Sequence, residues 1–304
     1  MKSDSKIIAL LATARIANVP SVLSNLGVGV LLGSIQNGAS FQWPWLLSLA
    51  AILFYICGNF FNDWADRDWD RIHRPERALP QGMFSANSYL AAAVIGTITG
   101  LFLAALNGFG AFLMALVLVS FIVQYTKVHK TAAWSVIPMG LCRACLPLLG
   151  YVAMRGGLAG PVIFPSLALL IYIIALSLSA RWEAKGDMPA EKRWRSKSLL
   201  YAAGMIAAVL PVLTYPMLGF IGLLPFFVWL RLCLSKFQSP VSVHVSALLA
   251  GIPLVDWVTL LPMGLIWLKL ERTSVMDPMS LTAFLLAPVC FVSGRVLQRL
   301  ASAT

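Results

Sequence analysis

The sequence predicts an all-α polytopic membrane protein, and its composition and charge pattern are the evidence. Of its 304 residues, 59% are hydrophobic and only 12% are charged, and the mean hydropathy is +0.82. A soluble domain carries about 25% charged residues, so most of this chain must face lipid or other apolar side chains. Without a repeat or a long linker to divide it, we expect one domain over residues 1–304.

Apolar runs define the membrane spans. A helix that crosses a bilayer needs about 20 residues, and shorter runs suffice when the helix tilts or the bilayer thins locally. In chain order the runs are Ile16–Ser34, Trp45–Phe61, Tyr89–Leu106, Ala111–Tyr125, Trp134–Ala153, Pro161–Ala180, Leu199–Leu213, Gly219–Leu234, Val243–Leu268 and Leu281–Ser293.

The number of spans is nine or ten, because two regions can be interpreted in two ways. Between Leu199 and Leu234 the letters TYPMLG would turn a tight hairpin if both halves cross the membrane. The first half of Val243–Leu268 would lie in the membrane interface if only its second half spans. Ahead of the first run, Ile7–Ala14 predicts an interfacial lead-in helix rather than a cleaved signal peptide.

Basic residues orient the chain. With ten spans and a cytoplasmic N-terminus, Arg155, Lys269 and Arg272 lie outside and Arg143 lies within a span. The remaining members of the 23 Lys and Arg residues lie on the cytoplasmic side, as the positive-inside rule requires. The net charge of +11 therefore reflects topology and attraction to anionic lipid, and it gives no support for nucleic-acid binding.

One cytoplasmic segment, GNFFNDWADRDWDRIHRPERALPQG (58–82), is unusually acidic for this chain. Asp63, Asp66 and Asp70 are spaced i, i+3 and i+7, so they share one face of a helix, and Pro75 would end that helix. Carboxylates along one stripe repel each other unless a cation neutralises them. Oxygen ligands favour Mg²⁺, Mn²⁺ or Ca²⁺.

A second acidic cluster follows two cytoplasmic segments later, in SARWEAKGDMPAEKRW (179–194). Glu183 and Asp187 are four residues apart, with Arg181 and Lys185 beside them. Two carboxylate clusters on one side of the membrane, with bases around them, suit a diphosphate bridged by metal ions. The alternative is that each cluster is an ordinary solvated turn.

Two charged residues lie deep inside predicted spans, where charge is costly and indicates a polar cavity or a partner. Arg143 either faces a cavity or forms a structural pair with Asp256. The histidines His73, His129 and His244 lack the spacing of a metal site, and we interpret them as loop or interface residues.

At these residues the sequence resembles the UbiA superfamily of intramembrane prenyltransferases. The family signature Asn-Asp-x-x-Asp-x-x-x-Asp after the second span is matched at Asn62, Asp63, Asp66 and Asp70. The turn that follows it in the family is matched by RPERALPQG (74–82). The segment QYTKVHK is similar to the Tyr and Lys element after the fourth span, with Tyr125 and either Lys127 or Lys130 as candidates. The second signature, usually Asp-x-x-x-Asp, begins here with Glu183.

The resemblance implies a ring of nine or ten helices around a central cavity, capped by the two acidic loops. It also implies Mg²⁺-dependent transfer of a prenyl group from an isoprenyl diphosphate to an aromatic or other small hydrophobic acceptor within the membrane. The chain is similar to poorly characterised bacterial branches of the family more than to its quinone-pathway enzymes, which implies the bacterial plasma membrane, with lipid around the spans. The distribution of Lys and Arg places the N-terminus and both acidic loops on the cytoplasmic side.

Site residues follow from the same resemblance. Asp66 and Asp70 would be catalytic, together with Arg143, Lys130 and Tyr125, whose ring would face the developing cation. The ligands of one Mg²⁺ would be Asn62, Asp63, Asp66 and Asp70, and those of the other Glu183 and Asp187. The diphosphate would contact some of Arg74, Arg77, Lys127, Lys130, Lys185 and Arg143.

The rival hypothesis is a membrane transporter or a catalytically degenerate family member that acts in lipid binding or assembly. Intramembrane Arg143 and Asp256 suit a transporter, but that interpretation leaves the paired acidic loops unexplained.

Overall fold

The computed structural model describes residues 2–37, 41–130, 132–158, 160–182, 189–271 and 277–299. In these ranges the chain forms α-helices joined by turns and by short 3-10 helices. In order these are α1 (Lys2–Thr13), η1 (Ile16–Asn18), α2 (Val19–Asn37), α3 (Trp45–His73), α4 (Ala86–Leu106), α5 (Phe109–Val128), η2 (Ala133–Ser135), α6 (Val136–Arg155), η3 (Gly160–Val162), α7 (Ile163–Ala180), α8 (Ala190–Thr214), α9 (Pro216–Ser235), α10 (Val241–Ala250), α11 (Ile252–Glu271) and α12 (Pro278–Leu297).

The described residues contain ten helical stretches that are long and apolar enough to cross a membrane. This confirms an all-α membrane protein, with ten candidate spans. The predicted hairpin in TYPMLG is present, because α8 ends at Thr214 and α9 begins at Pro216 with only Tyr215 between them. The predicted lead-in helix is α1, and its side chains Ile7 and Ile8 are exposed.

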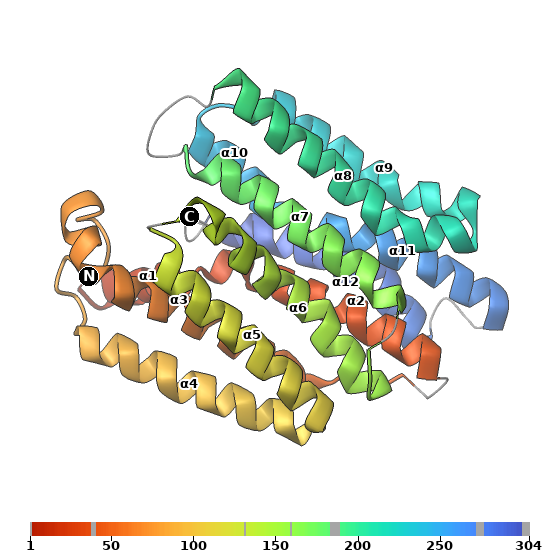
Figure 1. Ribbon diagram of the computed structural model, residues 1–304, viewed down its shortest axis with the longest axis horizontal. Coiled ribbons are helices and arrows are strands. Elements are labelled where there is room, and N and C mark those ends of the chain that lie inside the picture. The colour runs from red at the N-terminus through yellow and green to blue at the C-terminus, as the bar shows by residue number, and fades with distance from the viewer. Residues whose placement is uncertain are drawn as a thin grey trace.

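The helices lie side by side along the long axis of the molecule (Figure 1). Helix α4 forms one edge together with α3 and α5, and α8 and α9 form the opposite edge. Helix α2 lies between them, packed against α6, α11 and α12. Its side chains Val22, Leu26 and Val30 are fully buried, so the first span is the most enclosed helix of the bundle.

Helices α2 and α6 are in backbone contact. A Cβ atom built on Gly29 would lie 1.8 Å from the carbonyl oxygen of Pro147, and one on Gly150 would lie 2.4 Å from that of Leu26. Only glycine permits such an approach, which is a common way to pack helices within membranes. The contact brings polar residues of α2, among them Asn25, next to Arg143 on α6.

The ninth span is broken into α10 and α11 at Gly251, because Pro253 lacks the N–H that would continue the hydrogen-bond ladder of α10. In α10, the Ala247 carbonyl accepts a hydrogen bond from Trp229 Nε1 (3.1 Å), and the Leu248 carbonyl accepts one from the Tyr172 hydroxyl (2.7 Å). The nine-span alternative placed this half in the interface. Ala247 and Leu248 of this half are buried against α7 and α9, and α10 and α11 together form one candidate span.

Candidate active site

A cavity of about 380 Å³ lies inside the bundle, bordered by η1, α3, α5, α6, α7, α10 and α11. One end is charged and is formed where α3 and α5 end. The wall further in is mostly apolar, with Ile122, Met139, Ile173, Leu176 and Leu249 as its large side chains, and it contains Arg143. Polar side chains also border the cavity between its two charged regions, with Asn59 and Asn62 on α3 and Ser177 on α7.

The acidic stripe of α3 lies at the charged end. Asp63, Asp66 and Asp70 are 9%, 7% and 1% exposed, whereas the side chain of Asp68 is 69% exposed. The predicted helical face is thus present, and it points inward. The helix ends at His73, just before the predicted stop at Pro75.

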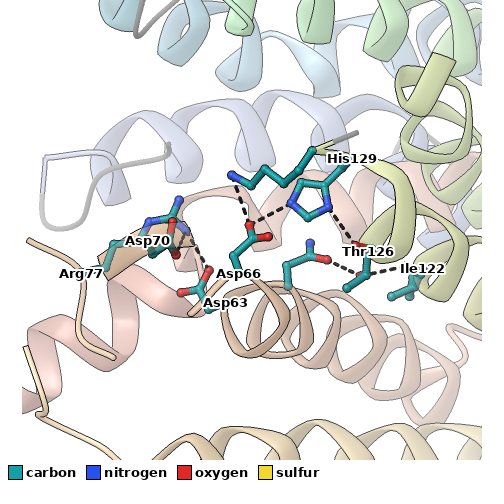
Figure 2. A network of polar contacts seen from close by, with 9 residues as sticks. Asp63, Asp66, Asp70, Arg77, Ile122, Thr126 and His129 are labelled. Carbon is teal, nitrogen blue, oxygen red and sulfur yellow. Dashed lines mark hydrogen bonds and ion pairs between the residues drawn. The ribbon is translucent and has the colours of Figure 1, made fainter. Parts of the chain in front are cut away.

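Arg77 holds two of these carboxylates together (Figure 2). Its Nη1 donates to Asp70 Oδ2 at 2.8 Å and to Asp63 Oδ1 at 3.3 Å. Burial alone would lower the pKa of Arg77, but the carboxylates of Asp63 and Asp70 outweigh it and raise that pKa. The guanidinium is therefore permanently charged, and the other oxygen of Asp70, Oδ1, is buried without a hydrogen-bond partner among the described residues.

Asp66 faces a different pair of side chains, His129 and Lys130. Its Oδ2 lies 2.8 Å from His129 Nε2 and 3.3 Å from Lys130 Nζ. The other ring nitrogen of His129 lies 3.0 Å from the Thr126 carbonyl (Figure 2). Both ring nitrogens of His129 thus lie within hydrogen-bond distance of oxygen atoms.

His129 corrects the sequence interpretation, which treated it as a loop or interface residue. It ends α5 and contacts Asp66 in the site. His73 instead stacks on Trp69, and His244 contacts the Cys233 carbonyl at an interface between helices, as expected.

The other predicted residues of α5 and of the turn after α3 are placed as follows. Asn62 borders the cavity, and its side-chain oxygen accepts a hydrogen bond from the Thr126 hydroxyl. Tyr125 and Arg74 also border the cavity. The two candidate lysines are both exposed, but they differ because Lys130 borders the cavity and lies over the Trp69 ring at 3.6 Å, whereas Lys127 is not among the residues that border it.

Arg143 lies in the inner part of the cavity, in a network of its own. Its Nη1 donates to Ser21 Oγ at 3.0 Å and to Asn25 Oδ1 at 3.1 Å, and its guanidinium lies 5.0 Å from the Tyr55 ring centroid. Tyr55 precedes Asp66 by about three turns of α3, or about 16 Å along the helix axis. Arg143 therefore borders the cavity at the level of Tyr55, about three turns of α3 away from Asp66.

Asp256 joins this network without touching Arg143 directly. Its Oδ2 accepts from Ser24 Oγ at 2.5 Å and from Asn25 Nδ2 at 2.8 Å. Because Asn25 also accepts from Arg143, the two alternatives of the sequence analysis are combined. Arg143 faces the cavity, and it is linked to Asp256 through an amide.

Two further cations border the cavity, Arg15 and Arg181. The sequence analysis counted Arg15 only as a topology charge, and it named Arg181 only as a base beside the second acidic cluster. Arg181 donates to the Ala132 carbonyl at 3.2 Å and to Ser135 Oγ at 3.0 Å. Arg15 has a left-handed backbone conformation, with φ of 47°, in the turn between α1 and η1. That turn is held by the Asn59 side chain, which donates to the Ala14 carbonyl.

The predicted second acidic motif lies outside the described residues, which include neither Glu183, Lys185 nor Asp187. Within the described part of the chain, no three His, Cys, Asp or Glu side chains converge on a point that a metal ion could occupy. The donor chemistry nevertheless fits magnesium. The first motif offers oxygen ligands throughout, Asn62 and Asp66 border the cavity, and one buried oxygen of Asp70 lacks a partner among the described residues.

Comparisons with known proteins agree with this architecture. A sequence model of the UbiA prenyltransferase family matches residues 23–270. A digeranylgeranylglyceryl phosphate synthase from Thermococcus kodakarensis is 28% identical over 216 residues, which cover 65% of this chain and 76% of the relative. The same enzyme from Pyrococcus horikoshii is 27% identical over 56% of this chain and 62% of the relative.

A solved structure with the same fold is that of a UbiA homolog from Archaeoglobus fulgidus bound to GPP and Mg²⁺. It covers 95% of this chain and 99% of its own, with a TM-score of 0.53 and 16% sequence identity. At that identity the likeness concerns the fold.

Proposed function

Because the chain belongs to the UbiA prenyltransferase family, we propose that it transfers a prenyl group from an isoprenyl diphosphate to a small hydrophobic acceptor inside the membrane, with Mg²⁺ as cofactor. The observation that carries the proposal is the charged end of the cavity, where Asp66 lies between His129 and Lys130. The Archaeoglobus homolog, which binds GPP and Mg²⁺, supports the choice of donor and metal.

The first motif would hold one magnesium ion, and the second, outside the described residues, would hold another. The ligands would be Asn62, Asp63, Asp66 and Asp70 in the first motif and Glu183 and Asp187 in the second. When bound, magnesium would supply positive charge to the departing diphosphate oxygen.

The chain's own cations would bind and orient the diphosphate. Arg74, Arg77 and Lys130 border the charged end of the cavity, and we add Lys185 from the second loop on sequence grounds alone. Fixed positive charge aimed at the leaving group stabilises the transition state more than the ground state, because charge develops there as the C1–O bond breaks. Lys127 lies on the outside of α5, so we assign it no such role.

The apolar wall would receive the prenyl tail and exclude water. Ile122, Met139 and Leu176 border the cavity next to the charged end, so an allylic cation formed there would be protected from hydrolysis. Tyr125 also borders the cavity, and its ring face would stabilise that cation. A nucleophilic atom of the acceptor then bonds to C1 and gives up its proton.

The direct test is an assay of purified protein in lipid nanodiscs with dimethylallyl, geranyl or geranylgeranyl diphosphate and a membrane extract as the acceptor source. We expect release of diphosphate and a prenylated product by mass spectrometry, both abolished by EDTA and restored by Mg²⁺. Binding of the prenyl diphosphates without any release would contradict catalysis and favour a family member that acts in lipid binding.

The two lysines after α5 give a matched pair of variants. We expect Lys130→Met to lower kcat/KM for the donor by roughly 10- to 100-fold, because it removes a charge that faces the diphosphate site. Lys127→Met removes the same charge from an exposed position and should stay within about twofold of wild type. Steady-state kinetics with varied donor concentration test this, and equal losses in the two variants would contradict the assignment.

We also propose that the charged end of the cavity faces the cytoplasm and that the membrane is the bacterial plasma membrane. The distribution of Lys and Arg supports this orientation. Reporter fusions after α3 and after α6, at His73 and Arg155, should report opposite sides of the membrane, with the former cytoplasmic.

A further inference from the structure

Arg143 lies too far from the diphosphate site to contact the diphosphate, but it could contact an acceptor. Its guanidinium lies beside Tyr55, about 16 Å along α3 from Asp66. A diphosphate bound at Asp66 is too short to span that distance. A ligand group that contacts Arg143 must therefore belong to a molecule other than the diphosphate, or to a different part of the substrate.

The network behind Arg143 fixes its position through one amide. The two ends of the Asn25 amide contact the two charged residues. Its Nδ2 donates to Asp256 at 2.8 Å, and its Oδ1 accepts from Arg143 at 3.1 Å. An ionised carboxylate only accepts hydrogen bonds. Asp256 therefore determines which end of the Asn25 amide faces Arg143, and a flipped amide would present donors to a donor.

Charge balance limits the ligand that this region would bind. Arg143 and Asp256 are 8% and 1% exposed, and with Asp256 ionised the pair carries no net charge. A net charge in such a place is expensive, because burial penalises any ion without a partner. An anionic ligand would give the buried pair of Arg143 and Asp256 an excess negative charge. An uncharged oxygen would accept a hydrogen bond from the guanidinium and leave the pair neutral.

We infer that the inner end of the cavity is the acceptor subsite, that Arg143 binds an uncharged carbonyl or hydroxyl oxygen of a hydrophobic acceptor, and that Asp256 is the residue that positions Arg143 through Asn25. The two hydrogen bonds that Arg143 makes in this network are both donated by Nη1. They fix one nitrogen of a guanidinium that carries five N–H donors. The inference deepens the proposed function, on which it rests for the identity of the reaction.

The ligand class can be tested by binding alone. The probes are 2-naphthol and 6-hydroxy-2-naphthoate, two naphthols that differ by a carboxylate, titrated into wild-type protein in nanodiscs. We expect 2-naphthol to bind at least about 10-fold more tightly than the naphthoate, and Arg143→Met to remove most of that binding. Tighter binding of the naphthoate, or binding of neither probe, would overturn the assigned ligand class.

The positioning role of Asp256 is tested by kinetic parameters that a purely structural residue would not change selectively. Asp256→Leu should lower kcat/KM for the acceptor by about 100-fold, as misplaced contact groups do. The donor KM should stay within about threefold, because Asp256 is remote from the diphosphate end. Asp256→Asn keeps a carbonyl oxygen that accepts from Ser24 and Asn25, so it should lose less than about 10-fold.

A double variant and a control complete the design. Arg143→Met combined with Asp256→Leu should be no worse than Arg143→Met alone, since Asp256 acts through Arg143. The control is Thr259→Val, one turn further along α11, which removes a buried hydroxyl that donates to the Ala207 carbonyl at 3.0 Å. It should lower the melting temperature without changing either KM.

Three results would contradict the positioning role. The first is a double variant whose loss of kcat/KM is the product of the two single losses, and the second is a loss of kcat/KM for the donor as large as that for the acceptor. The third is an Asp256→Leu variant that lowers only the melting temperature, as Thr259→Val should. The naphthol titrations are independent of turnover. Wild-type protein that binds 2-naphthol through Arg143 but releases no diphosphate would refute the proposed reaction and leave the acceptor subsite in place.

Discussion

Replacement of Asp66 by asparagine is expected to lower kcat for prenyl transfer by at least about 100-fold, the usual cost of removing one electrostatic contact from an active site. Of the three acidic residues on the inner face of α3, Asp66 is the one that borders the cavity. Asparagine keeps the size of the side chain and removes its charge. A metal ligand would be weakened, and His129 and Lys130 would lose the carboxylate they share.

The measurement is kcat at several magnesium concentrations, with a melting curve to show that the variant is folded. Asp68→Asn is the matched control, because Asp68 lies on the same helix but is exposed and contacts Arg71 at the surface. It should retain wild-type kcat within about twofold. Near-normal turnover of folded Asp66→Asn protein would eliminate the metal-binding and catalytic role of this residue.

Replacement of Arg77 by methionine should produce the largest loss of stability. It leaves the carboxylates of Asp63 and Asp70, whose side chains are 12% and 2% exposed, facing each other without their cation. Removing one partner of a buried ion pair costs about 3–5 kcal/mol. Turnover should fall as well, since the acidic stripe would no longer be held in place.

Magnesium offers a second readout for this variant. If the first motif binds Mg²⁺, the ion will replace part of the missing positive charge, so millimolar Mg²⁺ should raise the melting temperature of Arg77→Met more than that of wild type. The control is Arg71→Met, which breaks an exposed pair with Asp68 at 3.3 Å and should change stability by less than about 1 kcal/mol. Equal melting curves for the two variants, or no response to Mg²⁺, would show that Asp63 and Asp70 do not depend on a cation.

The sequence was sufficient to predict features that arise from local periodicity. Spacing of i, i+3 and i+7 separates buried Asp63, Asp66 and Asp70 from exposed Asp68, because a helix turns once every 3.6 residues. A single proline likewise marks where α3 ends. Hydropathy alone identified the spans, since each must satisfy its backbone hydrogen bonds internally.

Contacts between distant segments could not be predicted in this way. His129 meets Asp66 across 63 residues, and no local pattern distinguishes it from a histidine at a helix end. Ser24 and Asn25 look like ordinary small polar residues in an apolar run, and only the packing of α2 against α6 and α11 shows that they join Arg143 to Asp256. The left-handed backbone conformation of Arg15 could not be predicted either, because neither arginine nor its neighbours in the sequence indicate a positive φ.

The second acidic motif remains a prediction from the sequence. If Glu183 and Asp187 bind a metal, Glu183→Gln should weaken turnover at limiting Mg²⁺, whereas Glu183→Asp should keep part of it because the charge is retained. A magnesium titration of both variants tests this, and identical curves for wild type and Glu183→Gln would assign the loop to a solvated turn.

The central position of α2 has a consequence for biosynthesis. Ser24 and Asp256 are separated by 232 residues, so the first span to leave the ribosome waits for almost the whole chain before its polar face is complete. Until α6 and α11 are inserted, Ser24 and Asn25 have neither Asp256 nor Arg143 as partners and must face lipid, water or the insertion machinery. Closure of the bundle is therefore a late event set by long-range contacts, and a nascent chain that stops before α11 contains a first helix whose hydrogen bonds to Asp256 cannot form.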